Sequence, residues 1–142
     1  MLQNVRYLGV SLIKNNYGGE ERFWAALSHI SLVLVLQVPW GIGLLAPISI
    51  VYSKRKVSRW VAFQSLQALA AHSITWLFAV VYLVAKTNME EPNSVVVNIL
   101  AGLPLIGIIY ALLGTLATAM SRNFRYPFIG YFIERKLGIA EG

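Results

Sequence analysis

The chain contains no cysteine and no aspartate, and it carries few charged residues of any kind. Without cysteine, disulfides, thiol chemistry and cysteine-ligated metal sites are excluded. Charged residues make up 13% of the 142 residues, compared with roughly 25% in soluble proteins. The charges are also clustered, and they leave uncharged apolar stretches long enough for membrane spans, which need about 18 residues or more. The composition therefore indicates a single membrane domain over 1–142.

Acidic groups are missing from every predicted span. The six acids are all glutamates in predicted loops or tails: Glu20, Glu21, Glu90, Glu91, Glu134 and Glu141. Proton relays and ion-coupled transport usually need an acidic group inside the membrane. The sequence also has no H-E-x-x-H, no phosphate loop, no G-x-G-x-x-G and no G-x-S-x-G. We therefore expect no enzymatic activity, and no soluble small-molecule substrate is evident.

The net charge of +6 has a simple explanation in a membrane protein. Lysine and arginine collect in cytoplasmic loops and tails, where they set the orientation of the chain. A nucleic-acid partner is not expected, because no basic face alternates with exposed aromatic residues.

Apolar periodicity predicts an all-α, polytopic membrane helical bundle with four helix segments in 22–121. The first two, about 22–37 and 43–54, are joined at 38–41 around Pro39 and Gly41. Each is short for a full crossing, so they form a short or partly re-entrant hairpin. The third and fourth segments, about 58–86 and 95–121, are each long enough to span.

Two interfacial segments are expected to flank this bundle. Residues 1–19 carry leucine and valine at helical spacing and predict an amphipathic helix on the membrane surface, with a frayed terminus as the alternative. Residues 122–142 form a cytoplasmic tail in which Tyr126, Ile129, Ile133 and Leu137 share one face. This tail is predicted to be an amphipathic helix lying flat at the surface.

The distribution of basic residues predicts the topology. Lys54, Arg55, Lys56 and Arg59 form the densest basic cluster, the tail is also basic, and the loop 87–94 contains no lysine or arginine. Under the positive-inside rule, the chain is a multi-pass protein of the cell (inner) membrane with both termini cytoplasmic. Three spans with the N-terminus outside are the alternative.

Small and polar residues form stripes on the third and fourth segments. The third carries Gln64, Gln67, His72 and Thr75, and the fourth carries Gly107, Ala111 and Gly114. Close approach through small residues and interhelical hydrogen bonds drives helix association in membranes. We interpret both stripes as helix-packing surfaces. The alternative is a polar wedge that lines a water-filled path, and His29 of the first segment belongs to the same set of helix-packing or wedge candidates.

His29 and His72 are the titratable groups inside the predicted spans. Either could ligate a haem or a pigment metal from a helix face, so both are candidate cofactor ligands. Their positions on separate helices constrain no such site. We favour neutral histidines hydrogen-bonded to Ser28, Ser31, Gln67 or a carbonyl, and we expect neither a cofactor nor a metal.

Several phrases together resemble a known family. These are Arg22–His29, Leu45–Ile48, Val61–Leu69 and Phe124–Pro127. They are similar to a widespread prokaryotic family of small uncharacterised polytopic membrane proteins, distantly similar to the chloroplast inner-envelope import-channel subunit. Members often carry histidine where this chain has Gln64. The resemblance implies a fold and a topology, and no established activity.

The expected function is therefore structural. We expect a non-enzymatic accessory or structural subunit, with the lipid bilayer and a membrane protein or larger complex as partners. A translocation or permeation component is the first alternative, and a haem- or pigment-binding membrane protein is the second.

The topology is testable with single cysteines at Ser53, Asn88 and Ser121. An impermeant thiol reagent should label Ser53→Cys and Ser121→Cys from one side and Asn88→Cys from the other, because the basic segments face the cytoplasm. Labelling of Ser53→Cys and Asn88→Cys from the same side would contradict the prediction.

Overall fold

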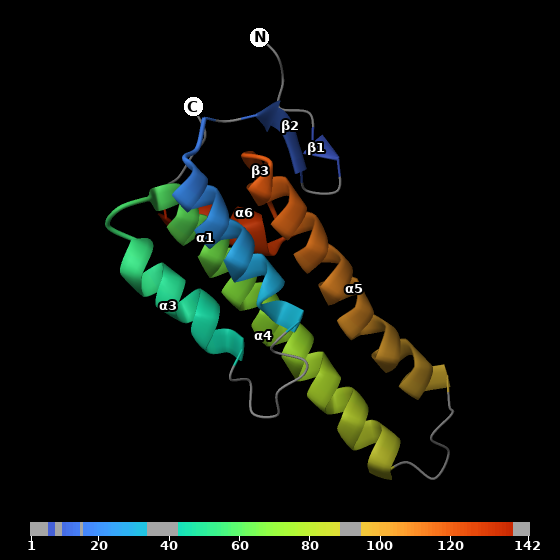
Figure 1. Cartoon of the computed structure of the whole chain (residues 1–142). Helices are drawn as coiled ribbons and strands as arrows, with labels where there is room; N and C mark the ends of the chain where they lie inside the picture. The colour runs from blue at the N-terminus through green and yellow to red at the C-terminus, as the bar shows by residue number, and fades with distance from the viewer. Residues whose placement is uncertain (1–5, 8–9, 15, 34–42, 89–94, 138–142) are drawn as a thin grey trace.

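The computed structural model describes residues 6–7, 10–14, 16–33, 43–88 and 95–137. Its strands and helices, in chain order, are β1 (Arg6–Tyr7), β2 (Val10–Lys14), α1 (Gly19–Ile30), α3 (Leu45–Lys54), α4 (Arg59–Asn88), α5 (Val95–Ala119), β3 (Arg122–Phe124) and α6 (Ile129–Leu137). The long helices α4 and α5 form the axis of the bundle, and α1 and α3 cover only the part of α4 nearest the strands (Figure 1).

Helices α4 and α5 are both long and apolar enough to cross a membrane. At 1.5 Å per residue, the 30 residues of α4 extend about 45 Å, against a hydrocarbon core of about 30 Å. The α4 sequence contains neither glycine nor proline, and the Ser58 hydroxyl caps its first turn by accepting from the Val61 amide. Only 22% and 11% of the most apolar windows of α4 and α5 are buried, unlike the core helices of soluble proteins.

Helices α1 and α3 are too short to span a membrane individually. Their 12 and 10 residues correspond to about 18 and 15 Å. Lys54 at the end of α3 pairs with Glu20 in the first turn of α1 at 2.6 Å, so α1 begins and α3 ends at the same end of the bundle. Hydrogen bonds from Lys54 and Trp24, together with the Lys54 charge, lower the pKa of Glu20. The expected joint at 38–41 lies outside the described residues.

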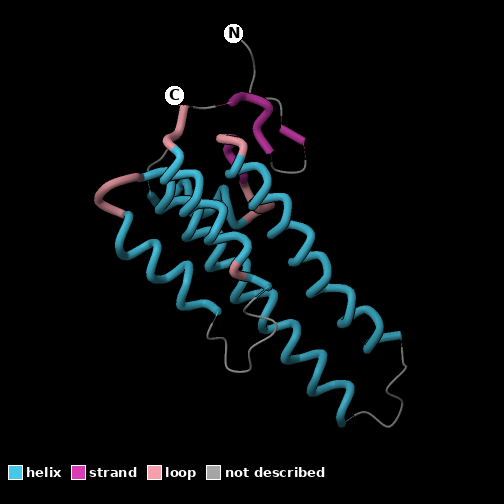
Figure 2. The backbone as a smooth tube through the Cα atoms, in the orientation of Figure 1, coloured by secondary structure: helices cyan, strands magenta, loops and turns pink. Residues whose placement is uncertain are grey.

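The N-terminal segment differs from the sequence prediction. Over 6–7 and 10–14 the chain forms strands, and β2 pairs with both β1 and β3 in an antiparallel sheet. The expectation of a helix over 1–19 is therefore wrong for these residues. The strands gather at one end of the bundle, shown in magenta in Figure 2. Helix α5 ends at this end of the bundle, so β3 lies beside the N-terminal segment. Pairing with β3 then outweighs the helical preference that the spacing of leucine and valine in this segment suggested.

The C-terminal segment also differs, because it is not a separate surface tail. The backbone of Ser121 is left-handed (φ 59°) and ends α5 by reversing the chain into β3. Phe124 and Tyr126 are then buried in the bundle. An amphipathic helix does follow, but it is confined to α6 and packs against α4. Because Ser121 is itself buried, Ser53 and Asn88, which are exposed, are the informative positions for labelling.

The glycines of α5 provide a direct test of its packing. A Cβ at Gly107 would overlap the Thr75 side chain, and a Cβ at Gly114 would lie 2.8 Å from His29 Nδ1 and 3.0 Å from Phe124 Cδ1. Nothing lies within 4 Å of a Cβ at Gly102. Gly107→Ala and Gly114→Ala should each destabilise the protein by about 1–3 kcal/mol through overpacking.

Gly102→Ala is the matched control on the same helix. It should be neutral, or stabilising by up to about 1 kcal/mol through its higher helix propensity. Unfolding midpoints of the three variants in one detergent measure the difference. Equal tolerance at all three positions would mean that α5 does not pack closely against α1 and α4.

Candidate functional site

A buried hydrogen-bond network joins α1, α4 and the segment between α5 and α6. The side chains of His29, Gln64 and Gln67 are fully buried, and that of Tyr126 is 4% exposed. Tyr126 Oη lies 3.2 Å from His29 Nδ1, and His29 Nε2 lies 3.1 Å from Gln64 Oε1. Gln67 Nε2 donates to Gln64 Oε1 (2.9 Å) and to the carbonyl oxygen of Phe124 (2.7 Å). The network thus connects residues nearly a hundred positions apart.

The Tyr126 backbone completes the network and determines the direction of its bonds. The Tyr126 amide donates to Gln67 Oε1 at 3.2 Å, which leaves Gln67 Nε2 as the donor toward Gln64. Gln64 Oε1 is therefore an acceptor, so His29 donates from Nε2–H and accepts at Nδ1. The Tyr126 hydroxyl then donates to His29. Burial raises the pKa of Tyr126 above its usual range, which keeps this proton on the phenol.

Aromatic rings enclose the network on the α5 side. Phe124 packs edge-on against His29, with ring centroids 5.4 Å apart, and edge-on against Tyr126 at 4.9 Å. Gly114 lies against both His29 and Phe124. Since the surroundings are apolar, losing one hydrogen-bonding partner would leave a desolvated polar group, at a cost of about 1–3 kcal/mol. This arrangement holds the short helix α1 and the C-terminal segment against α4.

The structure brings together only some of the candidate polar and small residues. His29, Gln64, Gln67 and Gly114 meet in the network, as described above. Thr75 donates to the Ala71 carbonyl of its own helix at 2.9 Å and contacts Gly107. Ala111 packs with Leu32 in a separate apolar cluster.

His72 lies near His29 but is not part of the network. The His72 ring lies close to the His29 backbone, but neither of its ring nitrogens makes a hydrogen bond of good geometry with a described residue. Gln64 Nε2 and Ser65 Oγ also have no partner among the described residues. The partners expected for the histidines were also partly wrong. The Ser28 and Ser31 hydroxyls donate to carbonyls of their own segment, because a serine inside a helix can reach the preceding turn.

Sequence reasoning missed the central role of Tyr126 and of the Phe124 carbonyl. Tyr126 was assigned to the apolar face of a surface helix, whereas it lies before α6 and inside the bundle. The resemblance motif Phe124–Pro127 was the available signal. The phrase marked the segment as part of the family resemblance, but it could not show which groups the segment bonds.

The described residues offer no clustered set of metal ligands. They contain no group of three or more histidine, aspartate or glutamate residues that could hold a metal ion. Both His29 nitrogens are already engaged, so a haem iron would have to displace either Tyr126 or Gln64. The ring nitrogens of His72 make no hydrogen bonds to side chains of the network, so His72 could ligate a metal without breaking the network.

A comparison with protein families matches residues 20–133 to the magnetosome magnetite crystal formation protein family. The chain belongs to this family. The matched region runs from the second residue of α1 through α3, α4, α5 and β3 into α6, so it covers every side chain of the network. No curated protein and no solved structure matches the chain.

Membership confirms that this is a membrane protein of a small prokaryotic family, as the sequence analysis expected. It does not support the distant similarity to the chloroplast import-channel subunit. The two apolar helices, α4 and α5, agree with a membrane location.

Two tyrosine variants test the energetic role of the network. Tyr126→Phe removes the donor to His29 Nδ1 and should destabilise the protein by about 1–3 kcal/mol. Tyr110→Phe is the matched control, because Tyr110 packs against the same Phe124 and Tyr126 rings and its hydroxyl makes no hydrogen bond with a described residue. It should change stability by less than about 0.5 kcal/mol.

Unfolding monitored by circular dichroism in detergent compares the two variants. A Tyr126→Phe protein as stable as the Tyr110→Phe protein would show that the network contributes little to stability.

Proposed function

We propose that this protein is a non-enzymatic, multi-pass accessory subunit of a larger membrane complex that takes part in magnetite crystal formation. The observation that carries the proposal is the closed network of His29, Gln64, Gln67 and Tyr126. Its polar groups bond mainly to one another and hold the fold together. The outer surface of α4 and α5 is apolar, with exposed residues such as Leu77, Ile99 and Ile109. Such a protein acts by contact with lipids and neighbouring chains.

Family membership supports the biological setting of this proposal. The family is described by magnetite crystal formation, and its members are magnetosome membrane proteins. A membrane that encloses a growing crystal needs proteins that organise other components as well as proteins that transport or transform ions. A protein that acts by contact with lipids and neighbouring chains belongs with the proteins that organise other components.

The charge distribution supports an orientation in the cell (inner) membrane with both ends of the chain cytoplasmic. Every lysine and arginine except Lys86 belongs to the end of the bundle where the strands and α6 lie (Figure 1). The hairpin of α1 and α3 begins and ends there, as the Glu20–Lys54 ion pair requires. The hairpin therefore returns to its own side, and α4 and α5 supply the crossings.

A permeation component is the second candidate, and one observation favours it. Gln64 Nε2, Ser65 Oγ and both ring nitrogens of His72 are buried on α4 without hydrogen-bond partners among the described residues. Buried polar atoms of this kind bind internal water when space allows, and a chain of such waters could form a path.

Native electrophoresis of gently solubilised membranes tests the accessory role. The tagged chain should migrate in an assembly larger than its 15.8 kDa monomer. Deleting its gene in a magnetite-forming host should change crystal size or shape, and the wild-type gene should restore them. Migration only as a monomer, together with unchanged crystals in the deletion strain, would contradict the proposal.

Liposomes containing the purified chain alone test the second candidate. The accessory role predicts no ion flux above that of empty liposomes. Flux that disappears in His72→Leu and persists in Ser73→Ala would replace the accessory proposal with the permeation role. Ser73 is the matched control because it neighbours His72 but is exposed and bonds only within its own helix.

A further inference from the structure

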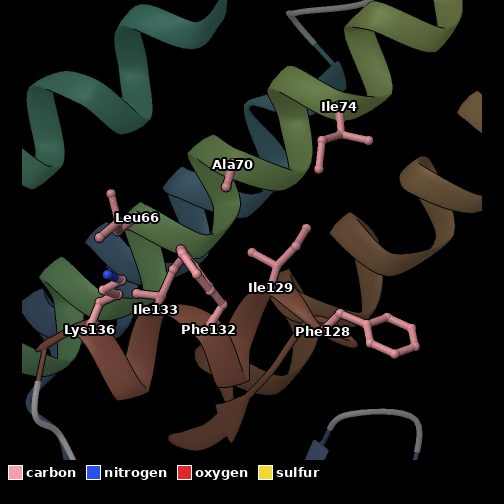
Figure 3. Close-up of a pocket in the computed structure, with 8 residues that line it drawn as sticks. All are labelled: Leu66, Ala70, Ile74, Phe128, Ile129, Phe132, Ile133 and Lys136. Atoms are coloured by element: carbon pink, nitrogen blue, oxygen red, sulfur yellow. The ribbon is translucent and has the colours of Figure 1, made fainter.

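An apolar groove runs along the outside of the bundle where α6 packs against α4. Its volume is about 560 Å³, within the range of ligand-binding pockets. Leu66, Ala70 and Ile74 of α4 form one wall, at i, i+4 and i+8. The other wall consists of Ile129, Phe132, Ile133 and Lys136 of α6, with Phe128 just before that helix (Figure 3).

The groove is polarised along the axis of α4. Lys136 lies beside Leu66 at one end, and Phe128 lies toward Ile74 at the other end (Figure 3). Leu66 is about 10 Å and Ile74 about 22 Å from Arg59 at the basic start of α4, at 1.5 Å per residue. The cationic end is therefore nearer the charged surface of the protein, and the fully apolar end lies deeper along the spanning helix.

Among the described residues, Lys136 is the one charged residue that lines this groove, and none of the described acids pairs with it. The neighbouring acid on α6, Glu134, is engaged by Arg125 on a different side of the helix, next to another pocket. The Lys136 ammonium instead lies 5.8 Å from the Phe132 ring centroid. Arg135 is exposed beside it and adds positive charge.

These features match one kind of occupant. An apolar channel with a cation at its shallow end that no described acid neutralises complements an amphiphile with an anionic head and a hydrocarbon chain. The surrounding membrane supplies such molecules in the required orientation, since headgroups lie at the surface and acyl chains point inward. A partner helix could fill the apolar walls, but it would leave the Lys136 charge without a counter-ion unless it carried an acid at that depth.

We propose that the groove between α4 and α6 binds one anionic phospholipid, with an acyl chain along Leu66, Ala70 and Ile74 and the phosphate paired with Lys136. The bound lipid connects α6 to α4 and fixes the height of α6 at the membrane surface. This inference depends on the membrane location of the protein and does not depend on the accessory role.

Native mass spectrometry of the full chain in detergent tests the charge requirement. The protein is offered equal amounts of phosphatidylglycerol and phosphatidylcholine with identical acyl chains. The wild type should retain one phosphatidylglycerol, about fivefold in preference, as expected for one cation near an anionic lipid. Lys136→Gln should lose this preference. Lys86→Gln is the control, because Lys86 is exposed, lies at the far end of α4 and stacks on Tyr82.

A second pair of variants tests the apolar groove itself. Ala70→Phe fills the channel and should lower the retention of both lipids, whereas Leu77→Phe, on the exposed surface of α4 outside the groove, should not. Phe132→Ala removes an exposed wall residue without disturbing the core and should also lower retention. If the Ala70→Phe protein does not fold, the lipid retention of Phe132→Ala alone tests whether the groove binds lipid.

Two results would overturn the proposal. One is an equal loss of lipid preference in Lys136→Gln and Lys86→Gln, which would show a general charge effect. The other is unchanged lipid retention in Phe132→Ala and in a folded Ala70→Phe protein, which would leave the groove to another occupant such as a partner helix.

Discussion

The fold depends on a hydrogen-bond network that is removed from water and anchored at both ends by one residue. Tyr126 donates from its hydroxyl to His29 and from its backbone amide to Gln67, and Gln64 links these two partners. Because the network is buried in an apolar bundle, none of its members can exchange a partner for bulk water without unfolding. The arrangement therefore specifies where the C-terminal segment returns to the helices.

Close packing makes this network possible. Helix α5 presents Gly114 to the His29 ring, and any side chain there would occupy space that the imidazole needs. Helix α1, although too short to cross a membrane, is held between α4 and α5 by this contact and by the bond from His29 to Gln64. A small residue on one helix and a polar residue on another thus act together, as is common in membrane bundles.

The packing of the helices gives the molecule one basic end, from which the apolar helices α4 and α5 extend. The sheet, the start of α1, the end of α3 and α6 gather at the basic end, whereas α4 and α5 extend beyond the other elements (Figures 1 and 2). At the basic end, α6 pairs Glu134 with Arg125 on one side and presents Lys136 to the apolar groove on another. The apolar groove beside Lys136 and the pocket beside Glu134 therefore both lie at or next to the charged end of the bundle.

The sequence by itself determined the membrane-helical class, the two long helices and most members of the network. Long uncharged stretches identified α4 and α5 to within a few residues at each boundary, because apolar length is a local property. His29, Gln64, Gln67 and Gly114 were candidates because polar and small residues are unusual in such stretches. Only the tertiary structure decided that residues 10–14 form a strand and that Tyr126 lies in the core. Both outcomes depend on β3, because α5 ends where β3 can pair with the N-terminal strand β2. A pairing edge or a hydrogen-bond partner 97 or more positions away leaves no periodicity in the local sequence, so helical spacing at 1–19 and 126–137 could not show it.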